Sequence, residues 1–177
     1  MKWQYLFLFL LICSGCSQGS SYHNFKLSEK QKIVNKLRKR VASDLQSQYG
    51  LIPFGTGGQM MYQVQKLMLI FNYPRQLTEE EARILVVNAT EEFLTAINEE
   101  VLLRQYLANY PFEPKNVEIT IFLQDSRGTS IQPEKFLVIK AADGFVTCMA
   151  KTPGTHDYRT VFKETFDEAK LKTLEKL

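Results

Sequence analysis

The spacing of apolar residues changes along this chain of 177 residues, and the change limits which fold classes are possible. In the first part, up to about residue 109, apolar residues recur every three or four positions, which is typical of helices with one buried face. From residue 117 they alternate with polar residues, which is typical of strands with one buried face. Helices and strands that are segregated along the chain predict an α+β fold.

Two helices are predicted before residue 72. The first covers residues 26–48, with Ser28 able to cap its start and Gly50 able to stop it. Residues 53–58 contain one proline and three glycines, so they predict a breaker loop. The second helix is predicted over residues 59–71, where apolar side chains return at helical spacing. The loop lacks the Gly-Lys-Ser/Thr of a nucleotide-binding loop, and we interpret it as a partner contact.

A third helix is predicted to start at a capping box. In that box Thr78 accepts a hydrogen bond from the amide of Glu81, whose side chain reaches back. The apolar stripe continues past Asn98, so the helix either runs on to Asn109 or bends near Asn98. Pro111 closes the segment, because proline cannot continue a helix.

Four strands and a last helix are predicted after this point. The strands cover residues 117–124, 136–141, 145–150 and 158–162. Asp143-Gly144 is a strong hairpin signal, because both turn positions need a positive φ that these residues tolerate. A capping box from Thr165 to Glu168 opens a helix that runs to Leu177. Residues 26–177 thus predict a single α+β domain with N-terminal helices, a four-stranded antiparallel meander and a C-terminal helix.

The first fifteen residues have the composition of an export signal. Lys2 supplies a positive start, residues 6–12 form an unbroken apolar run, and Ser14-Gly15 are small. This order is typical of a secretory signal peptide, here residues 1–15. The alternative, a transmembrane helix, needs about 20 apolar residues and the run is shorter than that.

Ser14-Gly15-Cys16 resembles the lipobox that ends the signal peptides of bacterial lipoproteins. That pattern has an aliphatic residue three positions before the cysteine, where this chain has Cys13. The resemblance implies that cleavage leaves Cys16 as the lipid-carrying N-terminus, with residues 16–25 as anchor and flexible tether. By resemblance to enterobacterial lipoproteins, Ser17 favours the outer membrane, with the domain in the periplasm or at the cell surface. Plain secretion with cleavage nearby stays open as the alternative.

Charge is unevenly distributed, although the net charge is only +3. A value this small does not indicate nucleic-acid binding, and nucleic acid is a poor partner for an exported protein. Residues 26–40 sum to +6, whereas residues 79–100 sum to −6. The candidate membrane- or partner-binding residues are Lys32, Lys36, Lys39 and Arg40. They would bind an anionic lipid or another envelope protein; alternatively, both segments are solvated helix faces that pack beside each other.

No catalytic residue set or metal site can be assembled from the sequence, and no cofactor is expected. Two histidines and three cysteines are too few for a site built mainly from those ligands. With Cys13 removed and Cys16 acylated, only Cys148 remains, and its apolar surroundings predict a buried, unreactive thiol. The sequence therefore favours a membrane-anchored, non-catalytic envelope binding or adaptor module. The alternatives are an exported carrier of a lipid or apolar ligand, and an envelope hydrolase with an unrecognised site.

Overall fold

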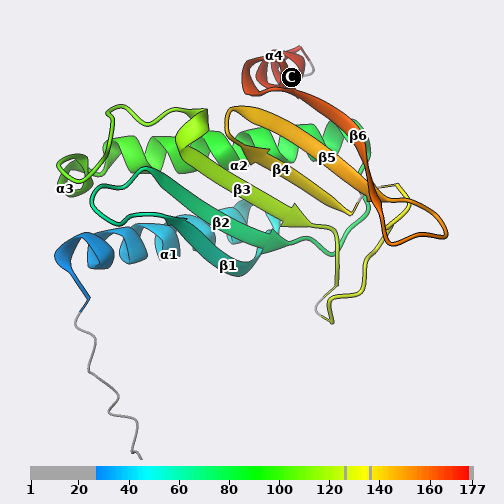
Figure 1. Ribbon diagram of the computed structural model, residues 1–177, viewed down its shortest axis with the longest axis horizontal. Coiled ribbons are helices and arrows are strands. Elements are labelled where there is room, and N and C mark those ends of the chain that lie inside the picture. Colours follow the sequence, from blue (N-terminus) through cyan, green and yellow to red (C-terminus); the bar gives the residue numbers. More distant parts are fainter. Residues whose placement is uncertain (1–26, 126, 136, 176–177) are drawn as a thin grey trace, which may run out of the picture.

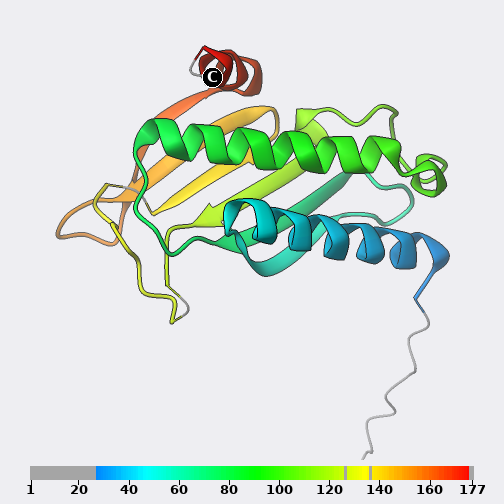
Figure 2. The same ribbon diagram turned by 180° about the vertical axis from the view of Figure 1, so that it is seen from behind.

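The computed structural model describes residues 27–125, 127–135 and 137–175, which form two layers (Figure 1). One layer is a six-stranded sheet, and helices lie side by side across one of its faces (Figure 2). The elements in chain order are α1 (Glu29–Tyr49), β1 (Ile52–Gln59), β2 (Lys66–Asn72), α2 (Glu79–Glu99), α3 (Val101–Arg104), a 3-10 turn η1 (Pro114–Asn116), β3 (Val117–Phe122), β4 (Val138–Ala142), β5 (Phe145–Lys151), β6 (Tyr158–Thr165) and α4 (Phe166–Leu174). The predicted α+β class is confirmed.

The helix starts predicted from capping residues are confirmed. Ser28, Thr78 and Thr165 each accept a hydrogen bond from the amide three residues on, within a complete capping box. Gly50, at φ 73°, ends α1 in the left-handed conformation that glycine adopts without strain. Of the two possibilities for the third predicted helix, the break between α2 and α3 corresponds to a bend near Asn98.

The sheet is larger than predicted and is mixed. The strand order is β1-β2-β3-β4-β5-β6, and all neighbouring pairs are antiparallel except β2 and β3, which are parallel. Parallel neighbours need a crossover connection, and α2 lies in that connection. The predicted four-stranded antiparallel meander corresponds to β3–β6, but it is incomplete because β1 and β2 extend the sheet.

Residues 52–72 form the β1–β2 hairpin, so the predicted breaker loop and second helix are wrong. The apolar residues of this segment fit both the helical period of three to four residues and the strand period of two. The observed burial follows the period of two. Leu67, Leu69 and Phe71 are buried against the helices, while Met68 and Ile70 between them are only partly buried. The glycines of the predicted loop belong to an edge strand; Gly58 leaves room beside Arg38 of α1, whereas Gly55 and Gly57 lie against Ile70 and Met68 of β2.

The core lies between the sheet and the helices, and one continuous cluster of buried apolar side chains fills it. Burial of each large apolar side chain stabilises the fold by about 1.5–3 kcal/mol. The largest fully buried side chains of this cluster are those of Phe71, Phe93, Leu37, Leu45, Leu51, Leu67, Leu69, Ile97, Leu103, Ile119, Ile121 and Leu123. Most of them come from α1, α2, β2 and β3, so α1 and α2 are both held on the same face of the sheet.

The turn between β4 and β5 is the one predicted from Asp143-Gly144. These residues have φ values of 54° and 79°, and Ala142 pairs with Phe145 on either side of them. Two successive positive φ values are typical of a type I′ hairpin turn.

We expect Gly144→Val to destabilise the domain by more than about 1 kcal/mol, because it forces a β-branched residue to a positive φ. Beyond its chain neighbours, a Cβ at Gly144 would meet no atom within 4 Å, so the loss would come from backbone strain. Urea unfolding measures the difference. Gly144→Asn is the matched control, since asparagine tolerates this conformation. Equal stability of the two variants would contradict the turn geometry.

Candidate functional site

Two basic residues of α1 are used to hold the β1–β2 hairpin. The Nζ of Lys30 donates to three successive backbone carbonyl oxygens of residues 60–62, at 2.7, 3.1 and 2.9 Å. The Arg38 guanidinium donates to the carbonyl oxygen of Gly57. These two cations therefore belong to the packing of α1 on the hairpin, although the sequence counts them in the basic segment.

Gly58 allows Arg38 to lie this close to β1. A Cβ at Gly58 would clash with the carbonyl oxygen of Lys66 and would lie 2.8 Å from Nη2 of Arg38. Any larger residue at Gly58 would therefore displace the guanidinium or the strand.

The four predicted binding residues are brought together on the outward side of α1. Lys32, Lys36, Lys39 and Arg40 are all exposed, and their spacing of three and four residues places them on one helix face. We call this set the basic face; it spans about 12 Å along the helix axis. Lys32 forms an exposed ion pair with Glu29 at 3.4 Å, which contributes little. Within the described part of the chain, the other three form no ion pair.

A groove of about 530 Å³ runs beside the basic face, between α1 and β1. Its lining residues are Asn35, Arg38, Lys39, Ala42, Ser43, Gln46, Pro53 and Thr56. We call it the α1–β1 groove. The lining contains two cations and no carboxylate, so the groove favours an anionic group.

Arg38 is the unusual group in this groove. Its side chain has five N–H donors, and only 5% of the residue is exposed. Among the described residues the guanidinium has one acceptor, the carbonyl oxygen of Gly57, and the buried Nε has none. Burial lowers the pKa of Arg38, because the charged form loses its hydration. An anion bound beside it would compensate for part of that loss.

The sequence interpretation missed Arg38 as a buried residue and missed the groove altogether. A signal was available, because Arg38 lies four residues after Val34 and one after Leu37, on the buried stripe of α1. Asn35 and Thr56 gave no signal, since their place in the groove depends on how α1 packs on β1.

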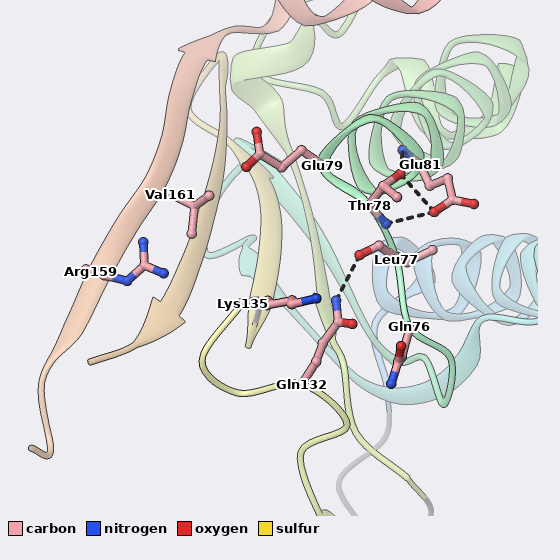
Figure 3. Close-up of a pocket in the computed structure, with 9 residues that line it drawn as sticks. All are labelled: Gln76, Leu77, Thr78, Glu79, Glu81, Gln132, Lys135, Arg159 and Val161. Atoms are coloured by element: carbon pink, nitrogen blue, oxygen red, sulfur yellow. Dashed lines mark hydrogen bonds between the residues drawn. The ribbon is translucent and has the colours of Figure 1, made fainter. Parts of the chain in front are cut away.

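A second hollow, of about 470 Å³, lies at the start of α2 (Figure 3). Lys135, Arg159 and Glu79 all line it, so its charges are of both signs. Its polar groups are largely engaged with the protein: Gln132 donates to the carbonyl oxygen of Leu77 at 2.9 Å, and Arg159 donates to a backbone carbonyl at 3.0 Å. The capping box uses amides of the α2 N-terminus, so this hollow is a weaker candidate than the α1–β1 groove.

The resolved carboxylate pKa shifts all have structural causes. The pKa values of Glu81 and Glu168 are lowered, because each accepts hydrogen bonds from the backbone and hydroxyl of its capping threonine. The pKa of Asp143 is lowered, because its carboxylate accepts a hydrogen bond from Lys66. Burial and Glu92 raise the pKa of Tyr49 to about 12. In the described ranges the carboxylate shifts reflect two caps and one ion pair, and the Tyr49 shift reflects burial beside Glu92. These shifts do not mark a pair poised for acid–base chemistry.

The parts of the chain that the structure describes contain neither a candidate metal site nor a candidate membrane span. No three His, Cys, Asp or Glu side chains gather there in a way that could hold a metal ion. No helix in those same ranges is both long and apolar enough to cross a bilayer. The predicted signal peptide, Cys16 and the tether lie outside the described residues.

Comparison of the chain with protein families, with curated proteins and with solved structures gave no match. The fold and the groove define an α+β domain with a basic helix beside an edge strand. What the chain does is therefore inferred from these residues and their arrangement.

Cys148 is confirmed as a buried thiol, and we expect it to be unreactive toward an aromatic disulfide reagent at pH 8. It is fully buried, and burial raises its pKa from 9.0 to about 12, which leaves about a thousandfold less thiolate. Because the folded pKa is raised, the associated stability is present below pH 9 and is lost as pH rises from 9.0 to about 12.

Labelling is measured on protein that begins at residue 17, in which Cys148 is the only thiol. The thiol should react once urea unfolds the chain. Equally fast labelling of the folded and unfolded protein would contradict the buried position.

Proposed function

We propose that this protein is an exported lipoprotein, held on a bacterial membrane through Cys16, whose domain is a non-catalytic binding module. The outer membrane is the favoured location, with the domain in the periplasm or at the cell surface. The lipobox-like end of the predicted signal supports the anchor. The basic face of α1 supports the binding role, and its partner is the anionic surface of the membrane that carries the anchor.

The observation that carries the binding role is that some basic residues of α1 contact the rest of the fold and others do not. Lys30 and Arg38 are used to hold the β1–β2 hairpin, whereas the basic face points outward and has no acidic partner beyond Glu29 among the described residues. Cations that the fold does not use are available to a partner. Near an anionic membrane each Lys or Arg adds about 1 kcal/mol of attraction.

The position of α1 in the chain adds to this argument. α1 begins at Glu29, soon after the proposed anchor, so its charges start close to the bilayer surface. A lipid anchor and a basic patch acting together hold a protein more firmly than either one alone.

The two alternative functions have less support. A carrier needs an empty apolar space, but buried side chains occupy the space between sheet and helices. A hydrolase needs poised acid and base groups, and the shifted carboxylates of the described residues serve as caps or ion-pair partners.

We expect replacement of Lys32, Lys36 and Lys39 by Glu to weaken binding of the lipid-free protein to vesicles that contain anionic lipid. Loss of about 1 kcal/mol per residue predicts at least about a hundredfold weaker binding. Binding of the parent should also fade as salt rises, because the Debye length is about 10 Å at 0.1 M. Vesicle co-sedimentation at several salt concentrations measures both effects.

The matched control makes the same charge change elsewhere. Lys135, Lys151 and Lys163 are exposed and lie around β4–β6, so their replacement by Glu should have a much smaller effect. Equal loss in the two triple variants would mean that net charge and not the basic face controls binding.

We expect Cys16→Ser to abolish incorporation of labelled fatty acid in a bacterial host and to prevent normal cleavage. The anchor should also resist high-salt washing, since each buried methylene contributes about 0.8 kcal/mol and a lipoprotein carries more than one acyl chain. Metabolic labelling followed by immunoprecipitation measures this.

Cys148→Ser is the matched control and should leave the label intact. Loss of label in Cys13→Ser with retention in Cys16→Ser would move the anchor to Cys13. A parent protein without label, released in soluble form, would replace the lipoprotein proposal by ordinary secretion.

A further inference from the structure

The sheet ends in two edge strands that differ in how well they are protected. β6 carries Arg159 and Lys163, exposed charges of the kind that discourage another strand from pairing. β1 carries no charged residue along its eight positions. Pro53 and the irregularity between Pro53 and Gly55 guard only its first part. The stretch from Gly55 to Gln59 carries no charge, proline or bulge, and its neighbour on the helix layer is α1, whose Arg38 donates to Gly57.

β1 is an edge strand of the sheet, and two of its residues line the α1–β1 groove. β1 pairs with β2 on one side, and no other strand lies beside it in the described ranges (Figure 1). Thr56 and Pro53 line the groove from β1, while Asn35, Ala42 and Gln46 line it from α1. A strand added beside β1 would form main-chain hydrogen bonds with the edge and would place every second side chain under α1.

The charges of the groove select an acidic strand. Arg38 and Lys39 line it, and the lining holds no carboxylate. Arg38 lines the groove, and its buried Nε has no hydrogen-bond partner among the described residues, so a carboxylate on the added strand would give this guanidinium a charged acceptor that it lacks.

Two sources within the protein itself do not fit. A second copy that paired β1 with β1 would bring Lys39 of each copy into the same region, which like-charge repulsion disfavours. Residues 1–26 contain no Asp or Glu, so the leader and tether offer no acidic strand. The occupant is therefore a segment of another protein.

We propose that the edge of β1 and the α1–β1 groove bind an extended acidic segment of another envelope protein as a seventh strand of the sheet. This rests on the proposed function, because it supplies a protein partner for the exported binding module. Of the basic face only Lys39 also lines the groove. Changes at Lys32 and Lys36 therefore test the membrane contact, and changes at Asn35 and Gln46 test the protein contact.

The test begins with a randomised eight-residue peptide library, selected on the mature protein in detergent micelles. Selected peptides are expected to alternate acidic with β-branched or aromatic residues. Binding of one such peptide should protect the backbone amides of residues 54–59 from hydrogen exchange. Exchanging its acidic residues for Lys, or methylating alternate backbone nitrogens, should weaken binding at least about tenfold.

Variants of the protein test whether the peptide binds in the groove. Asn35 and Gln46 are exposed and line the groove, so Asn35→Glu with Gln46→Glu should repel the acidic peptide and weaken binding at least about tenfold. Ser47→Glu with Thr95→Glu adds the same charge at exposed positions outside the groove lining and should leave binding within about twofold. Thermal unfolding of both variants checks that the fold is kept.

Several results would overturn the proposal. These are failure to select any peptide, peptides without acidic alternation, absence of protection in β1, or equal effects of the two double variants. Binding of inorganic phosphate or of anionic lipid micelles in the groove, with no peptide selected, would assign it to a headgroup and also overturn the proposal. Peptide binding by a protein that carries no lipid label on Cys16 would contradict the lipoprotein proposal and leave the groove proposal standing. A lipid label without peptide binding would contradict the groove proposal and leave the lipoprotein proposal standing.

Discussion

The parallel pairing of β2 with β3 decides where the other elements can lie. Leu67 lies opposite Val117, and the register continues to Asn72 opposite Phe122. Since parallel neighbours cannot be joined by a tight turn, the chain has to cross the sheet, and α2 makes that crossing on the helix-covered face (Figure 2). β1 then pairs with the free side of β2 and becomes an edge, which leaves α1 to cover it. The basic face and the α1–β1 groove both follow from that placement.

The contact between α1 and β1 has an electrostatic cost that the rest of α1 offsets. A buried guanidinium is unfavourable unless it is paired, and Arg38 has one neutral acceptor, the carbonyl oxygen of Gly57. The apolar stripe of α1, including Leu37 and Leu45, supplies the burial that keeps the helix in place. Gly58 allows the close approach that gives Arg38 its acceptor. Arg38 is therefore held in the groove by neighbours that do not neutralise its charge. A carboxylate that binds beside such an unpaired guanidinium gains the most favourable interaction energy.

Local chemistry explains which elements could be predicted from the sequence. A capping box needs only residues three apart, so the helix starts at Ser28 and Thr78 follow from nearby residues alone. The turn at Asp143-Gly144 is local in the same way, because it depends on two adjacent residues that tolerate a positive φ. Residues 52–72 could not be assigned in this way, because their apolar residues fit two periods and their glycines resemble a loop; pairing with β3 decided the outcome. The groove was beyond reach for the same reason, since the burial of Arg38 depends on where β1 lies.

The two charged regions of α1 differ in solvent exposure, and this gives them different roles. The basic face is exposed, so its attraction for an anionic surface is screened over about 8 Å at physiological salt. Such charges increase encounter and set orientation more than they add affinity. Arg38 is almost fully buried, so a carboxylate bound beside it would be screened much less. Salt should therefore release the helix from a membrane surface at concentrations that leave an acidic strand bound in the groove, and the domain could exchange one contact without losing the other.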